Sequence, residues 1–154
     1  TFLLDDVNCV GSERRLGDCP HLAYGSENCS ESEGAGFRCV VPTENDLRLV
    51  DGSARNRGRV EILHSNVWGT VCDDYISTAG TRQTNFVAVS CGDLGFERAG
   101  SALTTSAVVD GVEPIWLDDV NCSGAETQLA SCPNLGWNVE NCTNPEDIGL
   151  ACTP

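Results

Sequence analysis

The chain has 154 residues, a net charge of −14, 40% hydrophobic residues, ten cysteines and two histidines. All nine cationic side chains are arginine, and this acidic balance excludes a broad basic face for DNA, RNA or heparin. The cysteines form no Cys-x-x-Cys pair, and only His21 and His64 are available as further metal ligands. This argues against structural zinc and for disulfides formed outside the cytosol. The longest apolar stretches span a few residues, so any export signal or membrane anchor is expected outside this segment.

The first feature in chain order is one copy of an internal repeat. With an offset of 113 residues, residues 1–39 match residues 114–152 without a gap and agree at 18 of 39 positions. Both copies space four cysteines ten residues apart, at Cys9, Cys19, Cys29 and Cys39 and at Cys122, Cys132, Cys142 and Cys152. The later copy follows about 70 residues, with Cys72 and Cys91, that the earlier copy lacks. This pattern predicts a truncated unit at 1–40, a polar linker at 41–46 and a complete unit at 47–154.

The complete unit opens with strand-like segments. Residues 47–50 and 59–63 are followed by a third segment at 67–71. Between the last two lie Ser65 and Asn66, which suit a tight turn because asparagine tolerates positive φ. A β-hairpin is expected here.

A helix is expected next. Residues 85–94 place apolar side chains on one helical face, and the pattern ends at Gly95. After it we expect a strand at 115–117, a short helix at 125–131 and a closing strand at 149–152. Large aromatic residues are mostly buried, so the tryptophans are expected to fill cores: Trp68, Trp116 and Trp137.

Four segments of the complete unit carry a resemblance to a known family. They are 47–52 (LRLVDG), 68–74 (WGTVCDD), 88–95 (AVSCGDLG) and 115–122 (IWLDDVNC). Together with the evenly spaced late cysteines, they resemble the scavenger receptor cysteine-rich (SRCR) domain of the six-cysteine group. The resemblance implies a small disulfide-rich α+β fold, in which a curved antiparallel sheet cradles a helix, arranged here as a tandem repeat.

The resemblance also implies the disulfide pairing, since spacing alone cannot choose among the 15 connectivities of six cysteines. The implied bonds are Cys72 to Cys142, Cys91 to Cys152, Cys122 to Cys132 and, in the truncated unit, Cys9 to Cys19. The family partners of Cys29 and Cys39 belong to a missing upstream half-domain. These two cysteines either meet that half in a longer polypeptide or bond to each other or to a neighbouring molecule. We expect the longer polypeptide, because half a domain would expose its apolar face and two thiols.

The sequence departs from the family pattern near its acidic residues. Ile76 stands where the family usually has tryptophan, and the loop from Tyr75 to Thr84 is longer than usual. In the truncated unit, Gly34 stands where the complete unit has Asp147, so the truncated unit has one acidic residue fewer in this region.

Two groups of oxygen-bearing residues are candidate calcium ligands by resemblance. Asp73, Asp74 and Glu146 stand at positions where several family members bind Ca²⁺, and a second, weaker set comprises Asp118, Asn121 and Asn141. Three clustered carboxylates repel one another without a cation, and calcium accepts further oxygens from backbone, water or a ligand. The alternative is that these acids cap or form ion pairs locally, for example with the three arginines Arg55, Arg57 and Arg59.

Three Asn-x-Ser/Thr sequons are candidate sites for N-linked glycans: Asn28, Asn121 and Asn141. Each has a cysteine in the middle position, which restricts access once it is bridged. A glycan on Asn141 would prevent that side chain from binding calcium, so the two hypotheses exclude each other there.

No catalytic residue is predicted. Neither His21 nor His64 is placed by the sequence next to a nucleophile, and chemistry based on lysine is impossible without lysine. The leading hypothesis is an extracellular recognition module, secreted or on a cell-surface protein, that binds proteins or glycans with calcium as a candidate cofactor. The alternatives are a building block of an extracellular matrix or cell-surface filament, and an accessory arm of a larger secreted enzyme.

Overall fold

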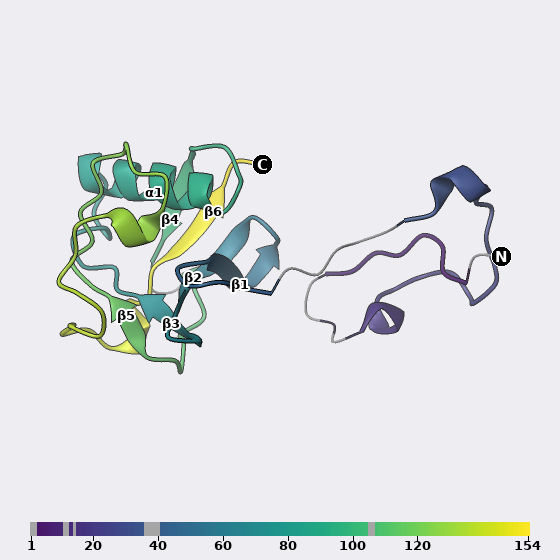
Figure 1. Cartoon of the computed structure of the whole chain (residues 1–154), viewed down its shortest axis with the longest axis horizontal. Helices are drawn as coiled ribbons and strands as arrows, with labels where there is room; N and C mark the ends of the chain where they lie inside the picture. Colours follow the sequence, from purple (N-terminus) through teal and green to yellow (C-terminus); the bar gives the residue numbers. More distant parts are fainter. Residues whose placement is uncertain (1–2, 11–12, 14, 36–40, 105–106) are drawn as a thin grey trace. The chain divides into compact units, whose positions relative to one another are not determined.

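The computed structural model describes residues 3–10, 13, 15–35, 41–104 and 107–154. The chain forms two compact units, Thr1–Val41 and Pro42–Pro154. Figure 1 shows the α-helix and the labelled strands of the second unit. In the first unit, the described residues form two single 3-10 turns, Leu16–Asp18 and Glu31–Glu33, and the chain between them makes a turn at Tyr24 and Gly25.

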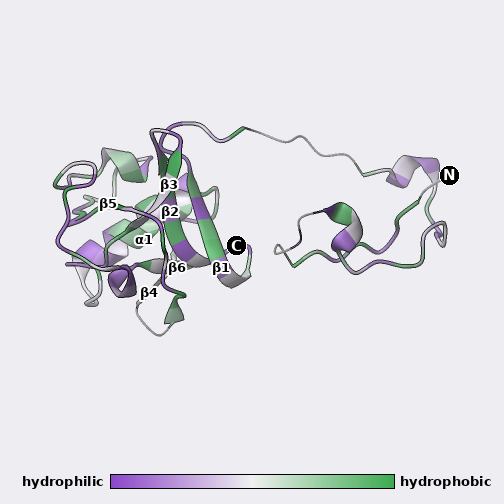
Figure 2. Ribbon diagram, turned by 90° about the horizontal axis from the view of Figure 1, so that it is seen from below, coloured by the Kyte–Doolittle hydropathy of each residue, from purple (hydrophilic) through white to green (hydrophobic). Residues whose placement is uncertain are grey.

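Six strands of the second unit form one curled sheet with helix α1 (Thr81–Asp93) packed against it. The strands are β1 (Leu47–Ala54), β2 (Arg57–His64), β3 (Val67–Val71), β4 (Gly100–Leu103), β5 (Ile115–Leu117) and β6 (Gly149–Cys152). Their order is β4-β6-β2-β3-β5, and β1 pairs separately with β2. Figure 2 shows both hydrophobic and hydrophilic residues along β1, whose first four residues are partly buried and whose last four are exposed.

Strand β2 is the centre of the sheet. One of its edges pairs with β1, and its other edge is shared, because β6 pairs with Arg57–Arg59 and β3 pairs with Glu61–His64. Dividing one edge between two strands makes the sheet curl. The hairpin expected between β2 and β3 is confirmed, with Ser65 at φ 51° and Asn66 at φ 63° in its turn.

The core lies between α1 and the sheet. The helix buries Phe86, Val87, Val89 and Cys91, and the sheet contributes fully buried residues such as Val60 and Ile62. Gly95, at φ 82°, follows the helix in a left-handed conformation, which confirms the expected end. The strands expected at 115–117 and 149–152 are confirmed as β5 and β6.

The structure corrects the fold expectation in several places. The sheet is mixed rather than antiparallel, because β3 pairs with β5 in parallel after a long crossover that includes α1. Helix α1 begins at Thr81, four residues earlier than expected, and strand β4 was not predicted. The helix expected at 125–131 is only a 3-10 turn at Leu129–Ser131.

The tryptophans are half-buried rather than buried, contrary to expectation. Trp116 and Trp137 pack on the edge of the core, and the ring of His64 stacks on Trp137 at 4.0 Å between centroids. Trp116 lies against Gly69 of β3, where an added Cβ would collide with the indole ring. Trp68 is covered by the guanidinium of Arg48, 4.2 Å from the ring centroid.

Residues 42–46 of the expected linker belong to the second unit. The backbone N–H of Asn45 donates to the carbonyl of Leu63, and that of Leu63 donates to the carbonyl of Asp46. The carboxylate of Glu44 accepts hydrogen bonds from the backbone N–H of Ser65 and contacts Nδ1 of His64 at 2.5 Å. These contacts extend the pairing of β1 and β2 by several residues.

Candidate functional site

The candidate site begins where β3 ends. Cys72 is fully buried, and the next two residues turn away from the sheet. The backbone N–H of Asp73 donates to the carbonyl of Glu146 at 2.7 Å, and the carbonyl of Asp73 accepts from Ile76 and Ser77. This turn anchors the backbone of Asp73 next to that of Glu146. Ile76, whose N–H closes this turn, is itself fully buried.

Asp74 and Asp118 are brought together from distant parts of the chain. Their carboxylate oxygens and the sulfurs of Cys72 and Cys142 all lie within 4.8 Å of one another. Those two sulfurs are bonded to each other at 2.00 Å, so they are not thiolates and cannot act as metal ligands. The group therefore offers only carboxylate oxygens, which suit a hard cation such as Ca²⁺ rather than zinc.

Burial and mutual repulsion raise the pKa values of both acids in the turn. Desolvation is the main reason that the pKa of Asp73 is raised, followed by the charges of Asp74, Glu146 and Asp147. The pKa of Asp74 is raised by desolvation and then by the charges of Asp118, Glu146 and Asp119. A negatively charged surface of this kind favours a bound cation.

The arginines do not neutralise this acidic group in the described part of the chain. Arg59 forms its ion pairs with Asp51, Glu61 and Glu113 instead. Arg55 lies over the ring of Phe96. Among the described residues, no arginine forms an ion pair with Asp73, Asp74 or Glu146, whereas Glu146 does cap locally through its hydrogen bonds from Thr143.

The two expected ligand sets are not separate in the structure, because Asp74 faces members of both. Asp118 accepts backbone N–H donors from Asp119 at 2.6 Å and from Asn141 at 3.3 Å. The Oε2 atom of Glu146 accepts from the N–H and hydroxyl of Thr143, which closes a capping box. Asn121 is exposed, and its backbone N–H donates to Pro133. The carboxylates retain unused lone pairs, since each carboxylate can accept about four hydrogen bonds.

Eight of the described cysteines form four disulfides, one in the first unit and three in the second. They join Cys72 to Cys142, Cys91 to Cys152, Cys122 to Cys132 and Cys9 to Cys19. These are the same four pairs that the resemblance implies. Cys29 is a free thiol, and Cys39 lies outside the described residues.

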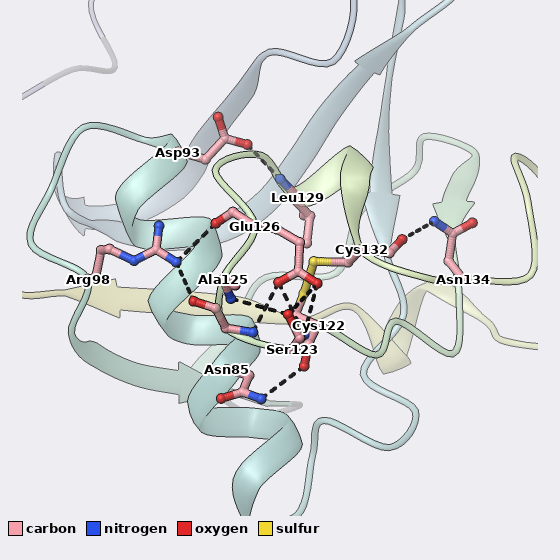
Figure 3. The surroundings of a disulfide bond; sticks show 11 residues. Asn85, Asp93, Arg98, Cys122, Ser123, Ala125, Glu126, Leu129, Cys132 and Asn134 are labelled. Atoms are coloured by element: carbon pink, nitrogen blue, oxygen red, sulfur yellow. Dashed lines mark hydrogen bonds between the residues drawn. A yellow bond between two sulfur atoms is a disulfide. The ribbon is translucent and has the colours of Figure 1, made fainter.

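The loop after Cys122 is held by one carboxylate (Figure 3). Glu126 accepts hydrogen bonds from the backbone N–H groups of Ser123 and Gly124 and from the hydroxyl of Ser123. The donors, led by the N–H of Ser123, lower the pKa of Glu126 to about 2.

Replacing this carboxylate gives a pH-dependent prediction. The lowered pKa means that Glu126 stabilises the fold above about pH 4.5, and that this contribution is lost as the pH falls from 4.5 towards 2. We expect Glu126→Gln to lower the melting temperature at pH 7 and to match the wild type at pH 2, measured by circular dichroism. Exposed Glu97→Gln serves as the control and should leave the melting temperature unchanged. A constant difference across the pH range would contradict this assignment.

All three sequon asparagines are exposed: Asn28, Asn121 and Asn141. The central cysteines of the last two sequons are disulfide-bonded, whereas Cys29, in the first, is free. Glycosylation at these positions stays a prediction.

The sequence reasoning missed one polar group around His64. The structure places its Nε2 3.4 Å from the hydroxyl of Ser65 and its Nδ1 2.5 Å from Glu44. The sequence alone did not indicate this arrangement. An acyl-transfer site also needs free donors for the oxyanion, yet the backbone N–H of Ser65 is already donated to Glu44. We therefore assign this group no catalytic role.

Comparisons with known proteins agree with this architecture. The family model for the scavenger receptor cysteine-rich domain matches residues 50–153. The SRCR domain of mouse MARCO, solved in its dimeric form, is 40% identical with a TM-score of 0.54, over 64% of this chain and 87% of that one. The third SRCR domain of murine neurotrypsin is 37% identical with a TM-score of 0.59, over 70% of this chain and 95% of that one. The chain therefore belongs to the scavenger receptor cysteine-rich family.

Proposed function

We propose that this chain is part of an extracellular recognition protein that binds proteins or glycans through an acidic, calcium-dependent surface. SRCR domains are typically non-catalytic binding modules outside the cell, and the four disulfides fit an oxidising compartment. No helix in the described ranges is long and apolar enough to cross a bilayer. The observation that carries the proposal is the close approach of the Asp74 and Asp118 carboxylates, which have no arginine partner among the described residues.

The donor chemistry fits calcium. Asp74 with Asp118, or Asp74 with Asp73 and Glu146, would hold the ion through carboxylate oxygens. Calcium takes six to eight oxygens, so positions not filled by the protein accept water or an anionic group of the bound partner. Such a site would link a sulfated, carboxylated or acidic partner to a protein whose own charge is −14.

Calorimetry on the full chain tests this proposal through Asp74→Asn. We expect calcium to bind the wild type and to bind the variant at least about tenfold more weakly, because one charged ligand is lost. Without calcium, the variant should be slightly more stable than the wild type, because the pKa of Asp74 is raised by desolvation and then by neighbouring carboxylate charges, and the amide carries no charge to be desolvated or repelled. The two signs are opposite, so a damaged fold cannot mimic the result.

Glu97→Gln is the matched control, since it removes one exposed negative charge from the turn after α1. It should leave calcium binding unchanged. Absence of binding heat and of any calcium-induced rise in melting temperature at millimolar calcium would overturn the calcium mechanism.

An accessory arm of a larger secreted enzyme is a second candidate function. Its support is the 37% identity to the third SRCR domain of murine neurotrypsin. The intact mass of the native polypeptide tests it, because a mass near 16.4 kDa would leave no room for a catalytic domain.

A further inference from the structure

Tyr75 is an exposed tyrosine in the turn that follows β3. The carbonyl of Asp73 accepts from the N–H of Ile76 at 2.9 Å, which makes Tyr75 the third residue of a tight turn. Ile76 is fully buried and anchors the turn, whereas the side chain of Tyr75 is 61% exposed. In the part of the chain that the structure describes, no group hydrogen-bonds the phenol hydroxyl of Tyr75. The phenol oxygen is therefore accessible to a modifying enzyme.

The backbone of Tyr75 adopts an unfavourable conformation for a large side chain. Its φ of 62° lies in the left-handed region, where the third residue of a turn is usually glycine or asparagine. A tyrosine in this conformation costs free energy, and its exposed ring buries little surface that could offset the cost. Packing of the second unit therefore gives no reason for a tyrosine here, whereas a role for its phenol group does.

The sequence around Tyr75 is acidic on one side. Asp73 and Asp74 directly precede it. Tyr24, the other tyrosine of the chain, is 64% exposed but has no acidic residue within two positions in the sequence (LAYGS). An enzyme that holds a polyanionic donor has a positively charged active site, so it binds acidic segments in preference to neutral ones. Local charge therefore distinguishes the two tyrosines, although their exposure does not.

A cation lies against the ring of Tyr75. The guanidinium carbon of Arg82 is 4.7 Å from the ring centroid. The ion pairs that arginines form within the described ranges involve Arg48 and Arg59, and none involves Arg82. An arginine stacked on an aromatic ring keeps its N–H groups available to an oxyanion. Arg82 can therefore supply the counter-charge for an anionic group added to Tyr75, next to the negative charge of Asp74.

We propose that Tyr75 is a site of tyrosine O-sulfation by a sulfotransferase of the secretory route, with an activated sulfate, a mixed anhydride of phosphate and sulfate, as donor. The phenol oxygen forms a bond to sulfur, and the bond between sulfur and the phosphate oxygen breaks. Its electron pair leaves with the phosphate, and a base of the enzyme takes the phenol proton. The product is an ionised sulfate ester beside Asp74. This inference rests on the extracellular location in the proposed function but not on calcium binding.

Peptide mass spectrometry of the full chain, secreted from cultured animal cells, tests the inference. After reduction, alkylation and removal of N-linked glycans, trypsin cleaves at arginine, so Tyr75 lies in peptide 60–82 and Tyr24 in peptide 16–38. We expect the added mass of one sulfuryl group on peptide 60–82 and none on peptide 16–38. The added mass should withstand alkaline phosphatase, and it should be lost when chlorate blocks synthesis of the activated sulfate in the cells.

Two matched pairs of substitutions test the position and the role of local charge. Tyr75→Phe should lose the added mass, whereas Tyr24→Phe should retain it. Asp74→Asn should lower the ratio of sulfated to unsulfated peptide at least about threefold, because it removes an acidic contact for the enzyme. Glu97→Gln removes an exposed acid elsewhere and should leave the ratio unchanged.

The possible failures separate this inference from the proposed function. A chain that is secreted and binds calcium but carries no sulfate overturns the inference alone. A chain that is sulfated but binds no calcium overturns the calcium mechanism alone. A chain that is retained in the cell overturns both, because both require the extracellular location. The inference is also overturned if phosphatase removes the added mass, or if peptide 16–38 carries it to the same extent.

Discussion

Replacing Cys91 and Cys152 together by alanine is expected to lower the free energy of unfolding of the second unit by about 4 kcal/mol. This disulfide joins α1 to β6 across 61 residues, so its removal frees a long loop in the unfolded chain. Both cysteines are nearly inaccessible, and the truncation also leaves apolar volume unfilled. Urea unfolding followed by tryptophan fluorescence measures the loss, since all three tryptophans lie in residues 42–154.

The Cys122 to Cys132 disulfide provides the comparison. It spans only 10 residues, so the same loop-entropy argument gives about 3 kcal/mol for its removal. The long bridge should therefore contribute more than the short one. If removal of the short bridge were as costly as removal of the long one, loop entropy would not be the main source of stabilisation.

Much of the fold was predictable because its signals are local or repeated. The turn at Ser65 and Asn66 fixes the hairpin, and the apolar spacing of 85–94 fixes most of α1. Strand β4 was missed because Gly100–Leu103 has little β propensity and is held in the sheet by pairing with β6. The first turn of α1 was missed because residues 81–84 are mostly exposed and show no apolar period.

The candidate site was predictable in its residues but not in its grouping. Asp73 and Asp74 are neighbours in the sequence, so their repulsion can be foreseen. The approach of Asp118 to Asp74 depends on parallel pairing of β3 with β5, which no local pattern encodes. The contact of His64 with Glu44 and Trp137 is likewise tertiary, because the three residues come from separate segments.

The sequence pattern also did not predict a buried ionic network centred on strand β2. Arg59 and Glu61 of β2 are 4% and 1% exposed and pair at 2.8 Å. Arg59 also pairs with Asp51 at 2.9 Å and donates to the carbonyl of Val109 at 2.5 Å. Glu61 has a second partner in the more exposed Arg48. Charges this deeply buried are tolerated only when each is paired.

Arg59→Met is therefore expected to lower the free energy of unfolding by about 3 kcal/mol, because it leaves buried carboxylate charge with less compensation. Arg48→Met is the control: Arg48 is 42% exposed, so its removal should cost less. Adding Glu61→Leu to Arg59→Met should recover part of the loss, because the apolar pair leaves no buried carboxylate without a partner. The measurement is again urea unfolding of the full chain. If the double variant were less stable than Arg59→Met alone, an unpaired Glu61 carboxylate would not be the cause of the loss, because its removal would then have lowered stability further.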